Sequence, residues 1–251
     1  MRRNNHSITK SKTWKGYHLY DRTQNKVEDG FYIKILDQLR NGLEGILEAE
    51  GRINVIRFDI SIREEDQFIP TGETTNKAVS ELFRILRRRI KAWKDKSGKN
   101  RKINNLFYGW VREESAAKSE HYHCFIAFKA QSNKRVPIYD TKAGKYIWIY
   151  KTIVDAWEEA SLVGQINFGS RVTDRFTGEI KQDNEFYYIE KAKDTGRKSL
   201  REAYKGLSYL AKVATKGNQP KDQRMFNFSR PIGTPNPAIT QIKALPTTPY
   251  Q

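Results

Sequence analysis

Apolar residues recur at three- and four-residue steps in four stretches of the chain, and this spacing predicts helices. Elsewhere apolar and polar residues alternate, which predicts half-buried strands. The predicted helices cover residues 31–50, 76–94, 152–162 and 199–216, with Gly217 closing the last. The predicted strands cover residues 53–62, 106–113 and 121–128, and a β-hairpin is expected over 166–191. Helices and strands do not alternate strictly, so the predicted class is α+β with an antiparallel sheet.

The same pattern divides the chain into three parts. Residues 1–30 are polar and basic, and we expect an arm or a loosely packed extension. Residues 31–230 hold every predicted helix and strand and are expected to form one domain. Residues 231–251 contain five of the eight prolines, which predicts an irregular tail.

The composition limits the functional classes to which the protein can belong. The 251 residues carry a formal net charge of +17, which indicates a polyanionic partner, with nucleic acid as the first choice. Cys124 is the only cysteine, so no disulfide framework forms within the chain and a reducing compartment such as the cytoplasm is expected. No apolar run reaches the roughly 18 residues of a membrane span, and we expect no membrane partner.

Basic side chains line the outer face of the helix predicted over residues 76–94. Arg87, Arg88 and Lys91 lie in this stripe. Such a stripe is usually a solvated helix face. In a chain of this charge it also suits a surface that follows a phosphate backbone, so we name these three residues as candidate DNA contacts.

Two of the four histidines stand two residues apart on a predicted strand. The side chains of His121 and His123 therefore point to the same face of the sheet, while Tyr122 and Cys124 point to the opposite, apolar face. Two neighbouring imidazoles are well placed to hold one metal ion. The alternative is a pair of polar strand residues that face solvent.

A catalytic divalent ion also needs an oxygen ligand. Glu113 and Glu114 end the preceding strand of the same hairpin and point to opposite faces, so only the register decides between them; we favour Glu113. Asp59, on the polar face of the first strand, is a further candidate for this cleft. Its other interpretation is a simple partner for Arg57 or another surface cation.

The candidate nucleophile is a tyrosine. Tyr-x-x-Lys strings begin at Tyr139, Tyr188 and Tyr209. Only Tyr209 lies in a well-formed predicted helix, where residues three apart are neighbours, so Lys212 is expected beside it.

The same helical projection groups further lysines with Tyr209. Lys205 and Lys216 fall on its side, so both are candidate DNA contacts, and Tyr204 falls on the apolar side and is predicted to be core. Taken alone, Tyr209 has a simpler interpretation as an ordinary tyrosine at the boundary between the core and the surface.

These elements fit one mechanism. A divalent ion polarises a phosphodiester, a tyrosine hydroxyl attacks in line to form a phosphotyrosine, and a lysine stabilises the developing charge. A later 3′-hydroxyl reverses the step and rejoins the strand.

The motifs resemble the HUH endonuclease superfamily of rolling-circle initiators and relaxases. The string His121-Tyr122-His123 and the downstream Tyr209-Leu210-Ala211-Lys212 carry the resemblance. With Arg57-Phe58-Asp59-Ile60 and Trp110-Val111-Arg112-Glu113, the chain looks most like the gene II-type replication initiators of filamentous phages (inoviruses), which also occur in bacterial prophages.

The resemblance implies a central antiparallel sheet of about five strands, Mg²⁺ or Mn²⁺, nicking of single-stranded or hairpin origin DNA, a 5′-phosphotyrosine and strand transfer in a bacterial host. Tyr204 and Tyr209 are five residues apart, which favours a single catalytic tyrosine. The sequence has no P-loop motif, so unwinding needs a host helicase.

Other functions remain open from the sequence. A plasmid mobilisation relaxase or a transposase uses the same chemistry, and the motifs do not separate them. A basic DNA-binding regulator on the same fold, without turnover, is the alternative of another class. An RNA-binding protein lacks a recognisable stacking motif here.

Overall fold

A computed structural model provides the fold. It describes residues 7–20, 30–62, 73–93, 103, 105–114, 120–130, 139–140, 145–146, 148–161, 164–168, 170–173, 180–183, 186–192, 195–213 and 225–230. The expected tail over 231–251 and Lys216 lie outside these residues.

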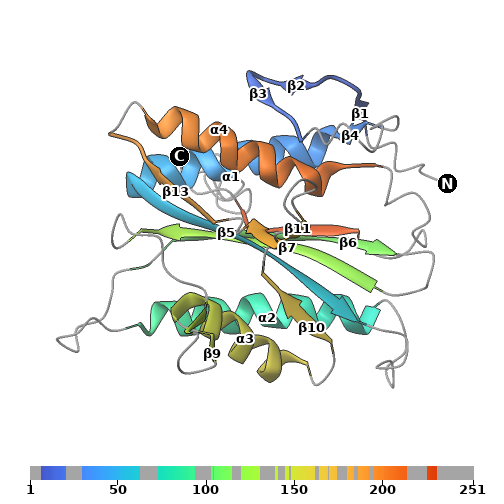
Figure 1. Ribbon diagram of the computed structural model, residues 1–251, viewed down its shortest axis with the longest axis vertical. Coiled ribbons are helices and arrows are strands. Elements are labelled where there is room, and N and C mark those ends of the chain that lie inside the picture. The colour runs from blue at the N-terminus through green and yellow to red at the C-terminus, as the bar shows by residue number, and fades with distance from the viewer. Residues whose placement is uncertain are drawn as a thin grey trace, which may run out of the picture.

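A mixed α+β architecture with one central sheet confirms the predicted class (Figure 1). The sheet of the described residues has six strands rather than about five, and every pairing in it is antiparallel. Its main path runs β10-β5-β7-β6-β14, and β13 also pairs with β5. The bounds are β5 Arg52–Ile62, β6 Leu106–Glu114, β7 Glu120–Lys129, β10 Gln165–Asn167, β13 Phe186–Glu190 and β14 Phe226–Phe228.

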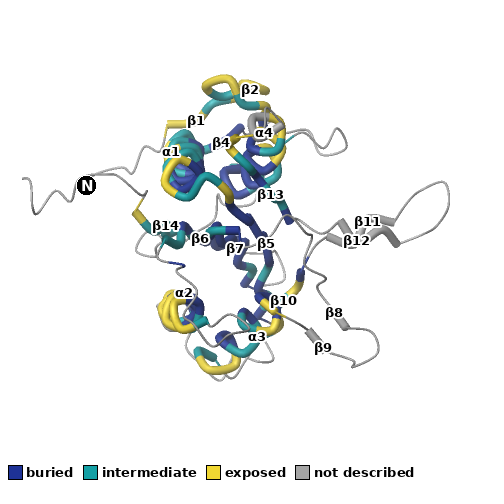
Figure 2. The backbone as a smooth tube through the Cα atoms, turned by 90° about the vertical axis from the view of Figure 1, so that its left-hand side faces the viewer, coloured by how far each residue is buried: buried dark blue, intermediate teal, exposed yellow. Residues whose placement is uncertain are grey.

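Helices cover both faces of this sheet. One layer holds α1 (Ile33–Glu50) and α4 (Thr195–Leu207), and the other holds α2 (Glu73–Lys91) and α3 (Trp148–Ala160) (Figures 1 and 2). Each layer packs on its own hydrophobic cluster. The apolar stripes that predict these helices are therefore the faces that they bury against the sheet.

The central strand β5 is buried on both faces. Phe58 and Ile60 belong to the cluster beneath α2 and α3, and Ile53 and Val55 belong to the cluster beneath α1 and α4. Two polar residues, Arg57 and Asp59, continue the second face. They break its apolar surface at the point where the site lies.

The hairpin expected over residues 166–191 is confirmed only for its inner part, where β11 (Ser170–Thr173) pairs with β12 (Ile180–Asp183), and is wrong for its outer strands. β10 and β13 do not pair with each other; both pair with β5, at Asp59–Ser61 and at Arg52–Ile56 respectively. Because β7 pairs along the other edge of β5, these two strands lie end to end on one edge. The hairpin of β11 and β12 is inserted between them.

The last predicted helix is shorter than expected. The α-helix ends at Leu207, and a 3₁₀ turn, η2 (Ser208–Ala211), follows it. Lys212 is already extended, with φ −59° and ψ 133°, and forms an isolated β-bridge with Phe31. The tight turn and this bridge redirect the chain before the predicted end at residue 216.

The described part of the N-terminal region packs on the α1 and α4 layer (Figure 2). Leu19 is 2% exposed and belongs to the core there. The short strands are β1 Ile8–Thr9, β2 Thr13–Trp14, β3 Tyr17–His18 and β4 Phe31–Tyr32, and a separate pair joins β8 Tyr139–Asp140 to β9 Lys145–Tyr146.

None of the helices in the described residues combines the length and the apolar character needed to cross a lipid bilayer.

Candidate active site

The register of three central strands builds one polar patch. On β7, His121 pairs with Ser61 of β5 and with Glu113 of β6, and His123 pairs with Asp59 of β5. Directly paired residues share a face of the sheet, so these five side chains face the α1 and α4 layer. The predicted alignment of the two histidines on one face is therefore confirmed.

The opposite face of β7 is apolar as predicted. Tyr122 and Cys124 are fully buried in the cluster beneath α2 and α3. Glu114 pairs with Glu120 rather than with a histidine, so the register brings Glu113 to His121 and His123.

His123 lies between two carboxylates. Its Nδ1 is 2.7 Å from Oδ1 of Asp59, and its Nε2 is 3.0 Å from Oε2 of Glu113. A carboxylate only accepts hydrogen bonds, so Nδ1 carries a proton that it donates to Asp59. This bond fixes the orientation of the ring and directs Nε2 toward Glu113.

The contact between Nε2 of His123 and Glu113 needs a cation. Nε2 is buried and makes no hydrogen bond with a described residue, so the 3.0 Å contact lacks the alignment of a hydrogen bond. With Nδ1 protonated, a neutral imidazole directs its Nε2 lone pair at a negatively charged oxygen. A second ring proton or a metal ion removes this repulsion.

The charged groups of this cluster shift the pKa values of His123 and Asp59 in opposite directions. Burial acts to lower the pKa of His123, but Asp59 and Glu113 together raise it above its usual value. Burial acts to raise the pKa of Asp59, but His123 and Arg57 together hold it below its usual value.

The donor set partly fits the predicted metal ion. In an octahedral site with bonds of about 2.1 Å, adjacent ligand atoms lie about 3.0 Å apart, which matches Nε2 of His123 and Oε2 of Glu113. His121 points to the same face, but its Nδ1 is 3.1 Å from Oγ of Ser61. Across the described ranges, no three His, Cys, Asp or Glu side chains converge as a ready metal site. The structure thus brings two of the three predicted ligands into contact.

Tyr209 lies against this histidine. Its ring centroid is 5.0 Å from that of His123, and the rings are nearly perpendicular at 88°. Lys212, which is 8% exposed, has its Nζ 5.8 Å from the Tyr209 centroid. The predicted proximity of Tyr209 and Lys212 is therefore confirmed, but it comes from the 3₁₀ turn and not from an α-helix.

Two contacts of Tyr209 were not predicted from the sequence. The guanidinium carbon of Arg57 lies 4.7 Å from the ring centroid, and the ring of Tyr20 packs edge-on at 5.1 Å. Burial, followed by the charge of Glu113, raises the pKa of Tyr209 to about 12, while Arg57 acts to lower it. An arginine on the polar face of the predicted strand, two residues before Asp59, is the sequence signal from which the Arg57 contact could have been found; Tyr20 has no comparable signal.

Two further residues were assigned a side of the helix predicted over residues 199–216. Lys205 is exposed on α4, and Tyr204 is fully buried, as predicted, with its hydroxyl donating to the backbone oxygen of Leu36 at 3.1 Å.

A family model now identifies the chain. The model of the YagK/YfjJ C-terminal domain matches residues 9–229. The chain belongs to this family. No curated protein and no solved structure matches it. The matched range of this YagK/YfjJ C-terminal domain contains the three central strands, Tyr209 and the N-terminal Tyr20 that packs on it.

The basic stripe of this family member lies on α2, on the opposite face of the sheet from α4 (Figure 1), and Tyr209 lies in the turn that follows α4. Arg88 and Arg89 pair with Glu159 of α3, and Arg89 also reaches Asp155 at 3.5 Å. Arg87 and Lys91 are exposed. Of the three predicted DNA contacts on α2, Arg88 is therefore held by an acidic partner from the neighbouring helix.

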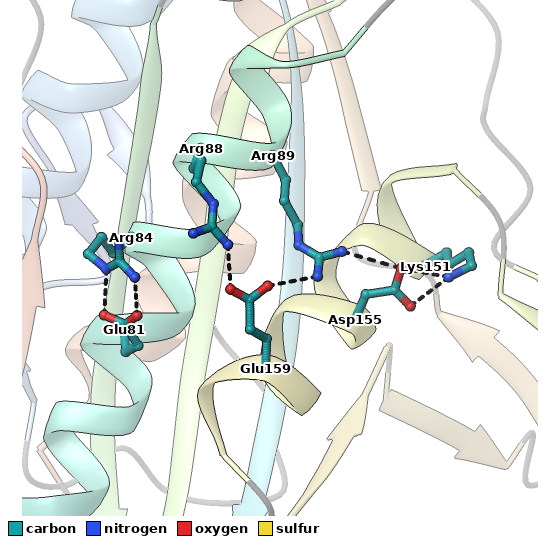
Figure 3. A network of polar contacts seen from close by, with 7 residues as sticks. All are labelled: Glu81, Arg84, Arg88, Arg89, Lys151, Asp155 and Glu159. Atoms are coloured by element: carbon teal, nitrogen blue, oxygen red, sulfur yellow. Dashed lines mark hydrogen bonds and ion pairs between the residues drawn. The ribbon is translucent and has the colours of Figure 1, made fainter.

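The rest of this network is local. Arg84 pairs with Glu81 one turn earlier on α2, and Lys151 pairs with Asp155 at 2.6 Å within α3 (Figure 3).

Proposed function

We propose that this protein is a metal-dependent single-strand DNA endonuclease and strand transferase that initiates rolling-circle replication. The observation that carries the proposal is the contact between the rings of Tyr209 and His123, which are 86 residues apart in the sequence. A tyrosine hydroxyl beside a histidine–carboxylate cluster suits metal-assisted transesterification at a phosphodiester, because one group supplies the nucleophile and the other can hold a Lewis acid.

The reaction is a transfer between two oxygens. The hydroxyl oxygen of Tyr209 attacks the phosphorus, the bond from phosphorus to the 3′-oxygen breaks, and a 5′-phosphotyrosine forms. The phenol loses a proton, and the released 3′-hydroxyl gains one. The phosphate bond is conserved, so attack by a 3′-hydroxyl reverses the step and rejoins a strand.

The surrounding residues supply position and charge. His123, Glu113 and His121 would hold Mg²⁺ or Mn²⁺, which when bound acts as a Lewis acid on the phosphate. Asp59 orients the ring of His123 through its hydrogen bond at 2.7 Å. Lys212 places a largely buried positive charge beside the phenol, which stabilises the anion that develops there.

The net charge of +17 supports a polyanionic substrate. We propose single-stranded or hairpin origin DNA, with a host helicase to open the duplex. A mobilisation relaxase or a transposase would use the same residues in the same chemical step.

The test is covalent capture of DNA. Wild-type protein is incubated with Mn²⁺ and a sequence-randomised pool of single-stranded oligonucleotides labelled at the 3′ end, because a 5′-phosphotyrosine retains the 3′ fragment. We expect a labelled protein band on a denaturing gel that disappears with chelator and in Tyr209→Phe.

The matched control is Tyr188→Phe. It removes the hydroxyl from a second Tyr-x-x-Lys string, on β13, where Tyr188 bonds to Glu190 away from the site. This variant should retain the labelled band. Attachment that persists in Tyr209→Phe would remove Tyr209 from its role, and salt-dependent DNA binding without any covalent band would favour the non-catalytic regulator.

A further inference from the structure

Arg57 is a buried cation in the middle of the central strand. It is 9% exposed, and its neighbours along β5, Ile56 and Phe58, belong to the hydrophobic core. Burying a guanidinium removes it from water at a large cost in free energy unless charged or polar groups compensate. The groups around Arg57 therefore indicate its role.

Those groups belong to both halves of the candidate active site. Nη2 of Arg57 is 3.3 Å from Nδ1 of His123 and 3.6 Å from Oδ1 of Asp59, and its guanidinium carbon lies 4.7 Å from the ring centroid of Tyr209. Nδ1 of His123 donates its proton to Asp59, so the attraction of Arg57 is to the carboxylate. One side chain thus links the histidine–carboxylate cluster to the tyrosine.

We propose that Arg57 is a positioning residue that holds the ring of Tyr209 against His123 and offsets the negative charge of Asp59 and Glu113 beside the phenol. This inference rests on the proposed endonuclease function. Neutralising Asp59 does not require the guanidinium to lie over an aromatic ring. The cation–π contact with Tyr209 is a separate attraction, and it holds the tyrosine ring beside β5.

Electrostatics at the phenol support this role. Two carboxylates near the nucleophile repel the negative charge that develops on the phenol oxygen as its proton leaves. The guanidinium carbon of Arg57, 4.7 Å from the Tyr209 ring centroid, sets a positive charge against this repulsion.

The planar guanidinium suits both tasks. It stacks on a ring while it directs N–H groups at a carboxylate, whereas an ammonium provides a point charge without stacking. Arg57→Lys should therefore retain part of the function, and Arg57→Met, which keeps the apolar length without the charge, should lose it.

The experiment compares the single-turnover rate of covalent attachment to the 3′-labelled oligonucleotide pool, together with the Kd for that pool and the Tm of each variant. We expect Arg57→Met to attach about tenfold more slowly than wild type with its Kd unchanged, and Arg57→Lys to lie between them. The matched control is Arg52→Met, an exposed arginine at the start of the same strand, which should keep the wild-type rate.

The outcomes separate this inference from the proposed function. If wild type attaches no DNA, both fail. If wild type attaches DNA and Arg57→Met attaches it as fast as Arg52→Met, only the inference is overturned. Should Arg57→Met not fold, Arg57→Lys decides, because a wild-type rate in that variant contradicts the requirement for stacking on Tyr209.

Discussion

The imidazole of His123 is held between an oxygen of Asp59 and an oxygen of Glu113, at 2.7 and 3.0 Å. Only one of these contacts is a hydrogen bond, and Nε2 is buried without one among the described residues. Asp59 therefore acts on the geometry of the ring, while Glu113 faces the nitrogen that either a second proton or a metal ion would occupy. This difference in role leads to a test at a single side chain.

Asp59→Asn should weaken Mn²⁺ binding. An asparagine keeps the size of the side chain but removes the charge that orients the ring and increases its basicity, and loss of such a partner typically costs about 10- to 100-fold in metal affinity. The measurement is a Mn²⁺ titration by electron paramagnetic resonance without DNA, which does not depend on activity.

Asp155→Asn is the control for that titration, because Asp155 lies on α3 and pairs with Lys151 across the sheet from the site. Equal Mn²⁺ affinities in the two variants would contradict the role of Asp59.

At this scale, alternation along a strand predicts which side chains share a face, and it correctly places His121 and His123 together. The register between strands, which the sequence does not give, brings Asp59 and Glu113 to them. Alternation does not predict what approaches that face from elsewhere. The contact of Tyr20 with Tyr209 joins residues 189 positions apart, and only the packing of the N-terminal region on η2 brings it about. The sequence near Tyr20 contains nothing that specifies this partner.

Helix ends at the site depend on tertiary contacts. The backbone N–H of Tyr20 donates to Oγ of Ser208, which itself donates to the carbonyl oxygen of Lys205. Lys212 then bridges to Phe31. The helical period continues through this region in the sequence, so the predicted end at residue 216 is wrong because these contacts favour a tighter turn.

The end of α1 was predicted correctly. Gly51 adopts φ 68°, and its N–H bonds to the carbonyl oxygen of Leu47, which is a local glycine cap. A helix end that is encoded locally can be predicted from the sequence, and one imposed by distant segments cannot.

Packing between elements leads to a stability prediction at Gly42. This residue lies on the buried face of α1, where an added Cβ would overlap the ring of Phe107 on β6. Phe107 is fully buried, so the ring has little room to move. Gly42→Ala should lower the free energy of unfolding by about 1–3 kcal/mol despite the better helix propensity of alanine, as measured by urea denaturation.

Asn41→Ala on the same helix is the control, because Asn41 is exposed and the change should leave the free energy of unfolding the same or slightly higher. A Gly42→Ala protein as stable as this control would show that α1 does not pack on β6 as closely as described.

At the scale of the whole molecule, two groups of cations in the described residues lie on opposite faces of the sheet. Arg57 and Lys212 lie beside Tyr209, and the stripe on α2 lies on the far side of the sheet, where part of it pairs with α3 (Figure 3). If DNA binds at Tyr209 as proposed, the stripe on α2 lies on the other side of the sheet from it. Net charge predicts a polyanionic partner, but it does not tell which face receives it.

The double change Arg87→Gln and Lys91→Gln tests the exposed part of that stripe. If both side chains contact phosphates, the slope of log Kd against log salt for single-stranded DNA should fall by about 1.4, while the attachment rate at saturating DNA stays the same. Arg84→Gln is the comparison, because Arg84 already pairs with Glu81. An unchanged slope in the double variant identifies a solvated helix face.

The central claim is that Tyr209 forms the bond to DNA beside His123. The most direct measurement is mass spectrometry of the peptide that remains linked to a nucleotide after the Mn²⁺ reaction, followed by proteolysis and nuclease digestion. The account predicts a single modified residue, Tyr209, carrying a 5′-phosphodeoxynucleotide. A nucleotide on any other residue, Tyr20 included, or none at all, would contradict it.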